Sequence, residues 1–169
     1  EDVAYYGEKS YPDGYYKGEF LNGMRHGEGT FTFNNGDEYW GDWYYDDRSG
    51  HGNYIEKNGD HYSGYFVYNK YFPGQKQYDG YKEYSNGYHK GEMINGEVTG
   101  YGVVTLDDGT LMEGYFINKN LYGYGKITWA NGERFEGKFE NDKRNGQGRH
   151  YFSDDIFECE YADDEPNGH

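Results

Sequence analysis

Polar and apolar residues alternate in short stretches of this chain. A period of two predicts β-strands, because successive side chains of a strand point to opposite faces. Tyr16, Gly18 and Phe20 would share one face, with a lysine and a glutamate between them on the other. The same frame, a glycine with an apolar residue two positions to each side, recurs at residues 39–43, 62–66, 112–116 and 135–139. We therefore expect strands with one glycine-and-aromatic face and one polar face.

Turn dipeptides separate these strands. Asn-Gly and Asp-Gly predict two-residue hairpin turns of type I′, since both central residues of that turn need positive φ. They occur at residues 13–14, 35–36, 58–59, 86–87, 108–109 and 131–132. The opposite edge would carry a longer loop, such as LNGMRH at residues 21–26. Each unit is thus predicted to be a hairpin of two short strands.

The glycines repeat with a fixed period. The glycine between the two apolar residues recurs every 23 positions, at Gly18, Gly41 and Gly64 and again at Gly91, Gly114 and Gly137, with one gap of 27 between the two sets. Gly-x-Gly pairs keep the same period, beginning at residues 27, 50, 100, 123 and 146. This periodicity predicts an all-β protein, an elongated single-layer antiparallel sheet of stacked β-hairpin repeats.

Composition supports a thin structure. Aromatic residues make up 21% of the chain and include 23 Tyr, whereas there are only 5 Val, 5 Ile and 4 Leu. A domain of two packed layers usually takes its core from aliphatic residues. Glycine normally weakens a strand, but the space that it leaves can hold an aromatic ring from a neighbouring strand. The composition therefore favours aromatic faces over a thick globule.

These repeats resemble the MORN-repeat (membrane occupation and recognition nexus) family. The similarity is closest in YYKGEFLNGMRHGEGTFTFNNG, from Tyr15 to Gly36, and in GERFEGKFENDKRNGQGRHYFSD, from Gly132 to Asp154. The resemblance implies an elongated array of hairpins that acts as a scaffold or attachment module. Family members occur in ciliary and cytoskeletal assemblies and as accessory segments of enzymes. Several bind a partner helix in an aromatic groove, and lipid binding has been proposed for the family.

On this resemblance we interpret residues 1–169 as one repeat array. The repeats cover about residues 14–35, 36–58, 59–86, 87–108, 109–131 and 132–154, between degenerate caps at 1–13 and 155–169. The third repeat is irregular, with four extra residues and Pro73. It could be a bend, a docking loop or a drifted surface loop. His89 and Met93 replace aromatic residues in the fourth repeat, and Cys159 occupies a glycine position near the end.

The charge of the chain limits its partners. Lys and Arg number 16 and Asp and Glu 31, which gives a net charge of −15. This acidity argues against nucleic acid and disfavours anionic lipid, although a local basic patch could still bind membrane lipid. It suits a basic protein or peptide. The spread of the acids along the chain is equally consistent with a role in solubility alone.

The sequence contains no persuasive catalytic or metal-binding motif, so we expect a protein that is not an enzyme and has no cofactor. His26 and His51 occupy matching repeat positions, which favours a structural role. The paired acids lack the spacing of a calcium loop, and no phosphate-binding glycine loop with a lysine occurs. A single cysteine excludes an internal disulfide framework and favours a reducing compartment. We therefore expect an intracellular, cytoplasmic location, with the cytoskeleton or a cilium suggested by the family.

The leading hypothesis is a non-catalytic scaffold within a larger assembly. It would bind an amphipathic helix or extended peptide with basic flanks along an aromatic groove. The candidate contact residues are Tyr16, Phe20, Tyr39, Trp43, Tyr62, Phe66, Phe116, Phe135 and Phe139. Alternatively, these rings only cover one another and the glycines. Other hypotheses are a phospholipid- or glycan-binding surface, choline capture included, and an accessory domain of a larger enzyme.

Overall fold

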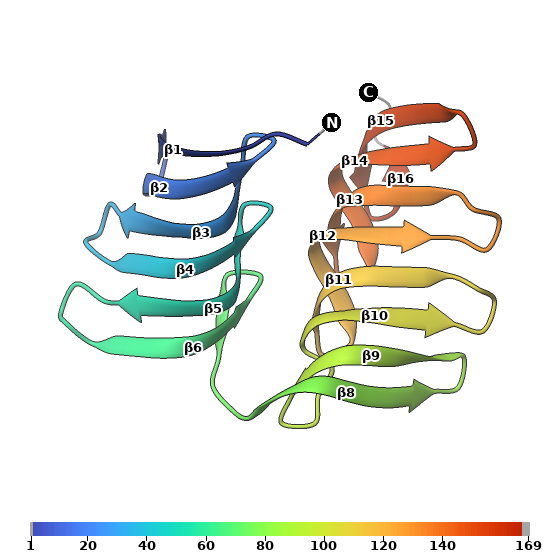
Figure 1. Cartoon of the computed structure of the whole chain (residues 1–169), viewed down its shortest axis with the longest axis horizontal. Coiled ribbons are helices and arrows are strands. Elements are labelled where there is room, and N and C mark those ends of the chain that lie inside the picture. Colours follow the sequence, from blue (N-terminus) through green and yellow to red (C-terminus); the bar gives the residue numbers. More distant parts are fainter. Residues whose placement is uncertain (1, 167–169) are drawn as a thin grey trace. The chain divides into compact units, whose positions relative to one another are not determined.

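The structure is a computed structural model that describes residues 2–166, and these residues form strands and turns without a helix (Figure 1). The ends of the two predicted caps, residue 1 and residues 167–169, lie outside the described residues. The strands are β1 (Ala4–Tyr11), β2 (Gly14–Leu21), β3 (Met24–Phe33), β4 (Glu38–Tyr44), β5 (Asp47–Ile55), β6 (His61–Val67), β7 (Lys70–Phe72), β8 (Lys76–Tyr84), β9 (Gly87–Ile94), β10 (Gly100–Leu106), β11 (Leu111–Ile117), β12 (Asn120–Thr128), β13 (Arg134–Glu140), β14 (Lys143–Phe152), β15 (Asp155–Ala162) and β16 (Glu165–Pro166).

The strands form two antiparallel sheets rather than the single continuous sheet that we expected. Strands β1 to β7 make a seven-stranded sheet and β8 to β16 a nine-stranded sheet, each in chain order. The chain accordingly divides into two compact units, which we call unit 1 (up to Pro73) and unit 2 (from Gly74). The predicted all-β fold of antiparallel hairpins is confirmed.

The irregular third repeat is the place where the first sheet ends and the second begins. Strand β7 has only three residues and is followed by Pro73, which cannot donate a ladder hydrogen bond. Strand β8 then repeats the role of β1. Gly80 pairs with Gly91 in unit 2 as Gly7 pairs with Gly18 in unit 1. The extra residues in the spacing thus accompany a new first strand.

Most of the two-residue turns lie on the side of the sheet opposite to the predicted one, although residues 12–13, 85–86 and 153–154 form such turns on the predicted side. Asn34, Asn35 and Gly36 form a three-residue loop in which the Gly36 N–H donates to the Phe33 carbonyl at 3.0 Å, and the positive φ belongs to the glycine alone (98°). The expected positive φ at both central residues occurs instead on the other side, for example at Asn22 (51°) and Gly23 (83°). The type I′ prediction was therefore wrong for all six dipeptides: at residues 35–36, 58–59, 108–109 and 131–132 only the glycine has positive φ, and at residues 13–14 and 86–87 neither residue does.

The turns with positive φ at both central residues form hydrogen bonds to the preceding repeat. The Asp46 N–H donates to the Arg25 carbonyl at 2.8 Å, and its Oδ1 accepts the Arg25 N–H at 2.9 Å. The same reciprocal pair is made by Asn22 with Val3, Asn69 with Arg48, Asn95 with Gln75, Asp142 with Leu121 and Asp164 with Arg144. Lys119 occupies this position between β11 and β12 and has no side-chain oxygen with which to accept.

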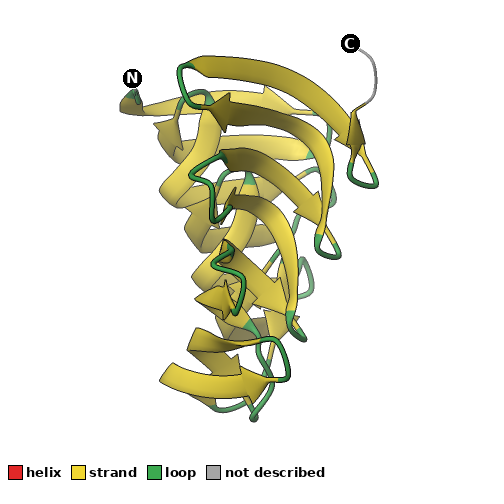
Figure 2. Cartoon of the chain, turned by 90° about the vertical axis from the view of Figure 1, so that its right-hand side faces the viewer, coloured by secondary structure: helices red, strands yellow, loops and turns green. Residues whose placement is uncertain are grey.

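Each unit has its own core on one face of its sheet. The core of unit 1 contains six buried aromatic residues: Tyr16, Phe20, Phe31, Tyr39, Trp43 and Phe66. The core of unit 2 is more aliphatic and contains Met93, Val98, Val104, Phe116, Leu121, Phe135, Phe139 and Tyr161. The strands bend strongly along their length (Figure 2). A single bent layer can bury these side chains because its strands curve, so that both ends of each strand lie above the face that carries the core.

Candidate functional site

We define the inner face of each sheet as the face that carries the recurring frame of glycines and rings, typified by Tyr16, Gly18 and Phe20. In β2 these residues are buried, whereas Tyr15, Lys17 and Glu19 on the outer face are exposed. The alternation that the sequence predicted is therefore present, and the inner face is the side on which a groove could form.

Glycines and rings interlock on the inner face. A Cβ atom added to Gly29 would lie 2.2 Å from the Tyr16 hydroxyl oxygen and 2.4 Å from ring carbons of Tyr16. A Cβ on Gly148 would lie 2.1 Å from Cζ of Phe135. The Tyr16 hydroxyl in turn donates to the Glu19 carbonyl at 2.6 Å. The second glycine of the Gly-x-Gly pair thus provides the space for a ring of the preceding strand at Gly29, Gly52, Gly102 and Gly148, whereas a Cβ on Gly125 would meet Leu121 and the Glu113 carbonyl.

The structure places eight of the nine predicted contact rings in the interior. Their exposed fractions are at most 4%, for Trp43, and six of them are at 0–1%. These eight are Tyr16, Phe20, Tyr39, Trp43, Phe66, Phe116, Phe135 and Phe139. Tyr62 is half-buried at the margin of the unit 1 core. The rings cover one another and the glycines, as in the alternative interpretation, and their contact with a partner stays a prediction.

Arginines extend over the inner face of unit 1. The Arg25 guanidinium lies 4.0 Å from the ring centroid of Tyr11 and 4.7 Å from that of Trp43. Its Nε donates to Asp46 Oδ1 at 3.0 Å. Tyr11 ends β1 on one side of the sheet, and Asp46 lies in a turn on the opposite side, where the other ends of the strands lie. Because the Arg25 side chain contacts residues from both sides, the inner face is the concave face of the sheet.

The same position recurs in the other repeats. It is occupied by Arg25, Arg48, Tyr71, Val98, Leu121 and Arg144. Arg48 lies over the rings of Phe33, Tyr39 and Tyr54, and Arg144 over those of Trp129, Phe135 and Tyr161. Burial lowers the pKa of Arg48. Sequence reasoning missed this position, although its 23-residue spacing on either side of the irregular repeat was a detectable signal.

A hollow of about 410 Å³ lies on the inner face of unit 2. Its apolar lining comes from Val104, Leu106, Met112 and Phe116. Residues at both ends of the strands complete the lining. Tyr84, Ser85 and Asn86 lie on one side of the sheet, and Lys119, Asn120 and Asp142 lie on the opposite side. We call this the unit 2 hollow. Apolar surface with a few polar groups at its rim is typical of binding pockets.

Two polar groups of the unit 2 hollow are partly desolvated. Burial raises the pKa of Asp142, and the carboxylate of Asp164 raises it further, while Lys119 opposes the shift. Burial also raises the pKa of Tyr84, with a smaller contribution from Asp142. The Tyr84 hydroxyl is buried without a hydrogen-bond partner among the described residues, as is that of Tyr11.

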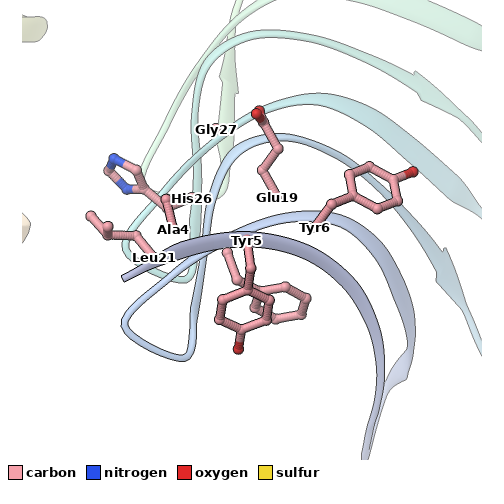
Figure 3. Close-up of a pocket in the computed structure, with 8 residues that line it drawn as sticks. Ala4, Tyr5, Tyr6, Glu19, Leu21, His26 and Gly27 are labelled. Carbon is pink, nitrogen blue, oxygen red and sulfur yellow. The ribbon is translucent and has the colours of Figure 1, made fainter. Parts of the chain in front are cut away.

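A second hollow, also about 410 Å³, lies at the first strands of unit 1 (Figure 3). Tyr5, 48% exposed, stacks on Phe20 with ring centroids 5.1 Å apart. Figure 3 shows Tyr6 and Glu19 on the opposite side of the strands from Tyr5, with His26 at one end. Burial lowers the pKa of His26, and its Nδ1 accepts the Tyr45 N–H at 3.1 Å. That bond gives His26 the structural role expected from its repeat position.

Within residues 2–166, no three His, Cys, Asp or Glu side chains are placed together so that they could hold a metal ion. The described part of the chain also has no helix long and apolar enough to cross a membrane. Cys159 is a free cysteine, and its Sγ lies 3.5 Å from the Glu160 carbonyl oxygen.

The fold and the inner face define a class, a repeat protein of antiparallel hairpins whose rings pack on glycines. A family model described as the MORN repeat matches residues 16–38, 89–111, 113–134 and 135–155, more than half of the chain. The chain belongs to the MORN-repeat family. MORN repeats are generally protein- or lipid-binding modules, and the family is not typically catalytic. A comparison with curated proteins found no match.

Proposed function

We propose that this chain is a non-catalytic protein-binding module that receives an extended or helical peptide of a partner on the inner face of unit 2. The unit 2 hollow carries this proposal, because it is a mainly apolar depression of about 410 Å³ on a face whose other large side chains are buried or, like Ile127 and Trp129, half-buried. The buried rings would shape this face, and side chains of the hollow would make the contact.

Charge favours a basic partner. The chain carries a net charge of −15, and Asp142 contributes a carboxylate to the rim of the unit 2 hollow. Such a surface attracts basic segments and speeds their association. A cytoplasmic scaffold in a cytoskeletal or ciliary assembly is the setting that we propose from the family.

Peptide selection tests the proposal. Random peptides of about 15 residues, displayed on phage, would be selected on the immobilised chain and then measured by titration calorimetry. We expect enriched peptides with micromolar affinity that weaken at least tenfold, about 1.4 kcal/mol, in Leu106→Glu. Leu106 lines the unit 2 hollow, whereas Leu111, exposed at the start of β11, does not, so Leu111→Glu is the matched control.

Two outcomes would contradict the proposal. One is the absence of any enriched peptide; the other is equal weakening by Leu106→Glu and Leu111→Glu. Sedimentation with phosphatidylserine vesicles in the same buffers would identify the lipid alternative, which the net charge of −15 disfavours.

A further inference from the structure

The two units have the same repeat positions, so unit 1 can be compared with unit 2 residue by residue. Gly14 and Gly87 open equivalent strands 73 positions apart, and each pairs with the last residue of the strand before it, Tyr11 and Tyr84. With this offset, Trp43 of unit 1 corresponds to Phe116 of unit 2. Tyr84 and Phe116, which line the unit 2 hollow, thus match the two rings nearest to the Arg25 guanidinium.

The residue that would fill the hollow is missing in unit 2. Val98 stands at the position of Arg25, is 3% exposed and is part of the core. Its side chain ends at the γ-carbons, so no guanidinium reaches between Tyr84 and the opposite side of the sheet. Val104 stands at the position of Phe31, the third ring under Arg25, and is also smaller.

We infer that the unit 2 hollow binds an arginine side chain of the partner peptide, in the place that Arg25 occupies in unit 1. This inference rests on the proposed function and specifies its recognition chemistry. A guanidinium stacks on aromatic rings and forms directional bonds to a carboxylate, which an ammonium does less well.

Charged groups at the rim determine how well the arginine would bind. Asp142 Oδ1 accepts the Leu121 N–H at 2.7 Å, which leaves its second oxygen for a guanidinium. Lys119 stands where unit 1 has Asp46, the partner of Arg25, and its ammonium opposes a bound cation. Tyr84 presents its ring, as Tyr11 does to Arg25, because its hydroxyl oxygen is buried.

Variants that copy unit 1 give the sharpest test. In Val98→Arg/Lys119→Asp, unit 2 acquires its own counterparts of Arg25 and Asp46, which should occupy the hollow and exclude an added arginine. In Lys119→Asp alone, the hollow stays open and gains a carboxylate. We expect this single variant to bind an arginine peptide roughly three- to tenfold more tightly than the wild type.

The probe is the peptide acetyl-Gly-Arg-Gly-amide, titrated into the whole chain and followed by the NMR signals of the Met112 methyl group and the Phe116 ring. Matched peptides with citrulline or lysine in place of arginine control for shape and for charge. We expect saturable shifts with arginine, at least fivefold weaker binding with lysine or citrulline, and no saturable binding in Val98→Arg/Lys119→Asp. Thermal melting of each variant checks that it is folded.

Equal binding of the lysine peptide, unchanged binding in the double variant, or the absence of shifts at Met112 and Phe116 would overturn the inference. The outcome is separable from that of the peptide selection. Selected peptides that need Leu106 but contain no required arginine would leave the proposed function standing and remove this inference. If no peptide is selected, the proposed function fails.

Discussion

Single positions of the repeat show how one residue type determines local packing. Tyr16, Tyr39 and His89 occupy the same position, and the two tyrosine hydroxyls donate to the carbonyl three residues ahead at 2.6 and 2.7 Å. His89 brings its Nε2 only to within 3.4 Å of the Glu92 carbonyl, and its buried Nδ1 has no hydrogen-bond partner. His89 is therefore a poorer fit to a position that suits tyrosine.

His89 should make the stability of the chain depend on pH. Burial lowers its pKa in the folded state, so between that value and the ordinary value of about 6.5 the unfolded chain binds more protons. Stability contributed by neutral His89 is thus present above pH 6.5 and is lost as pH falls. We expect His89→Tyr to gain more in melting temperature over wild type at pH 5.5 than at pH 7.5.

The matched control for His89→Tyr is His51→Tyr, because His51 is exposed on β5. It should leave the pH profile of the melting temperature close to that of the wild type. An identical pH profile for His89→Tyr and the wild type would show that His89 does not cause the dependence.

At the scale of the element, the hairpin of β2 and β3 is stabilised by the Tyr16 ring on one strand, which packs against Gly29 on the next. We expect Gly29→Ala to lower the free energy of unfolding by about 1–3 kcal/mol, because its Cβ would overlap the Tyr16 ring. Urea unfolding followed by tryptophan fluorescence measures the change. Gly7→Ala is the control, since a Cβ there meets its nearest atoms at 3.6 Å. Equal losses in both variants would refute the interlock.

The turns show why a local motif predicted the hairpins but not their geometry. Asn35-Gly36 does mark the end of one strand and the start of the next, yet only Gly36 adopts positive φ. Across the sheet, Tyr45 and Asp46 adopt φ of 44° and 74°, which is unusual for a tyrosine. The contact of Asp46 with Arg25 in the previous hairpin holds that turn, and a dipeptide rule contains no such contact.

At the scale of the whole molecule, the chain consists of two units with separate cores. We expect about ten Gly and Ser residues inserted between Pro73 and Gly74 to leave the melting temperature within about 2 °C of the wild-type value, because no ladder hydrogen bond is lost. The same insertion between Asn118 and Lys119 interrupts a hairpin of unit 2 and should lower it clearly. A comparable loss from both insertions would contradict two independent cores.

The sequence by itself determined the class of fold, because alternation, turn glycines and the 23-residue period are local properties that each hairpin repeats. It also predicted which side of each strand carries Tyr16, Gly18 and Phe20. It could not decide whether those rings are exposed. Only the tertiary structure decided this, because the curved strands bring their two ends over the inner face and so bury the rings. The unit 2 hollow likewise depends on residues from Tyr84 to Asp142, which approach one another only after the sheet has curved.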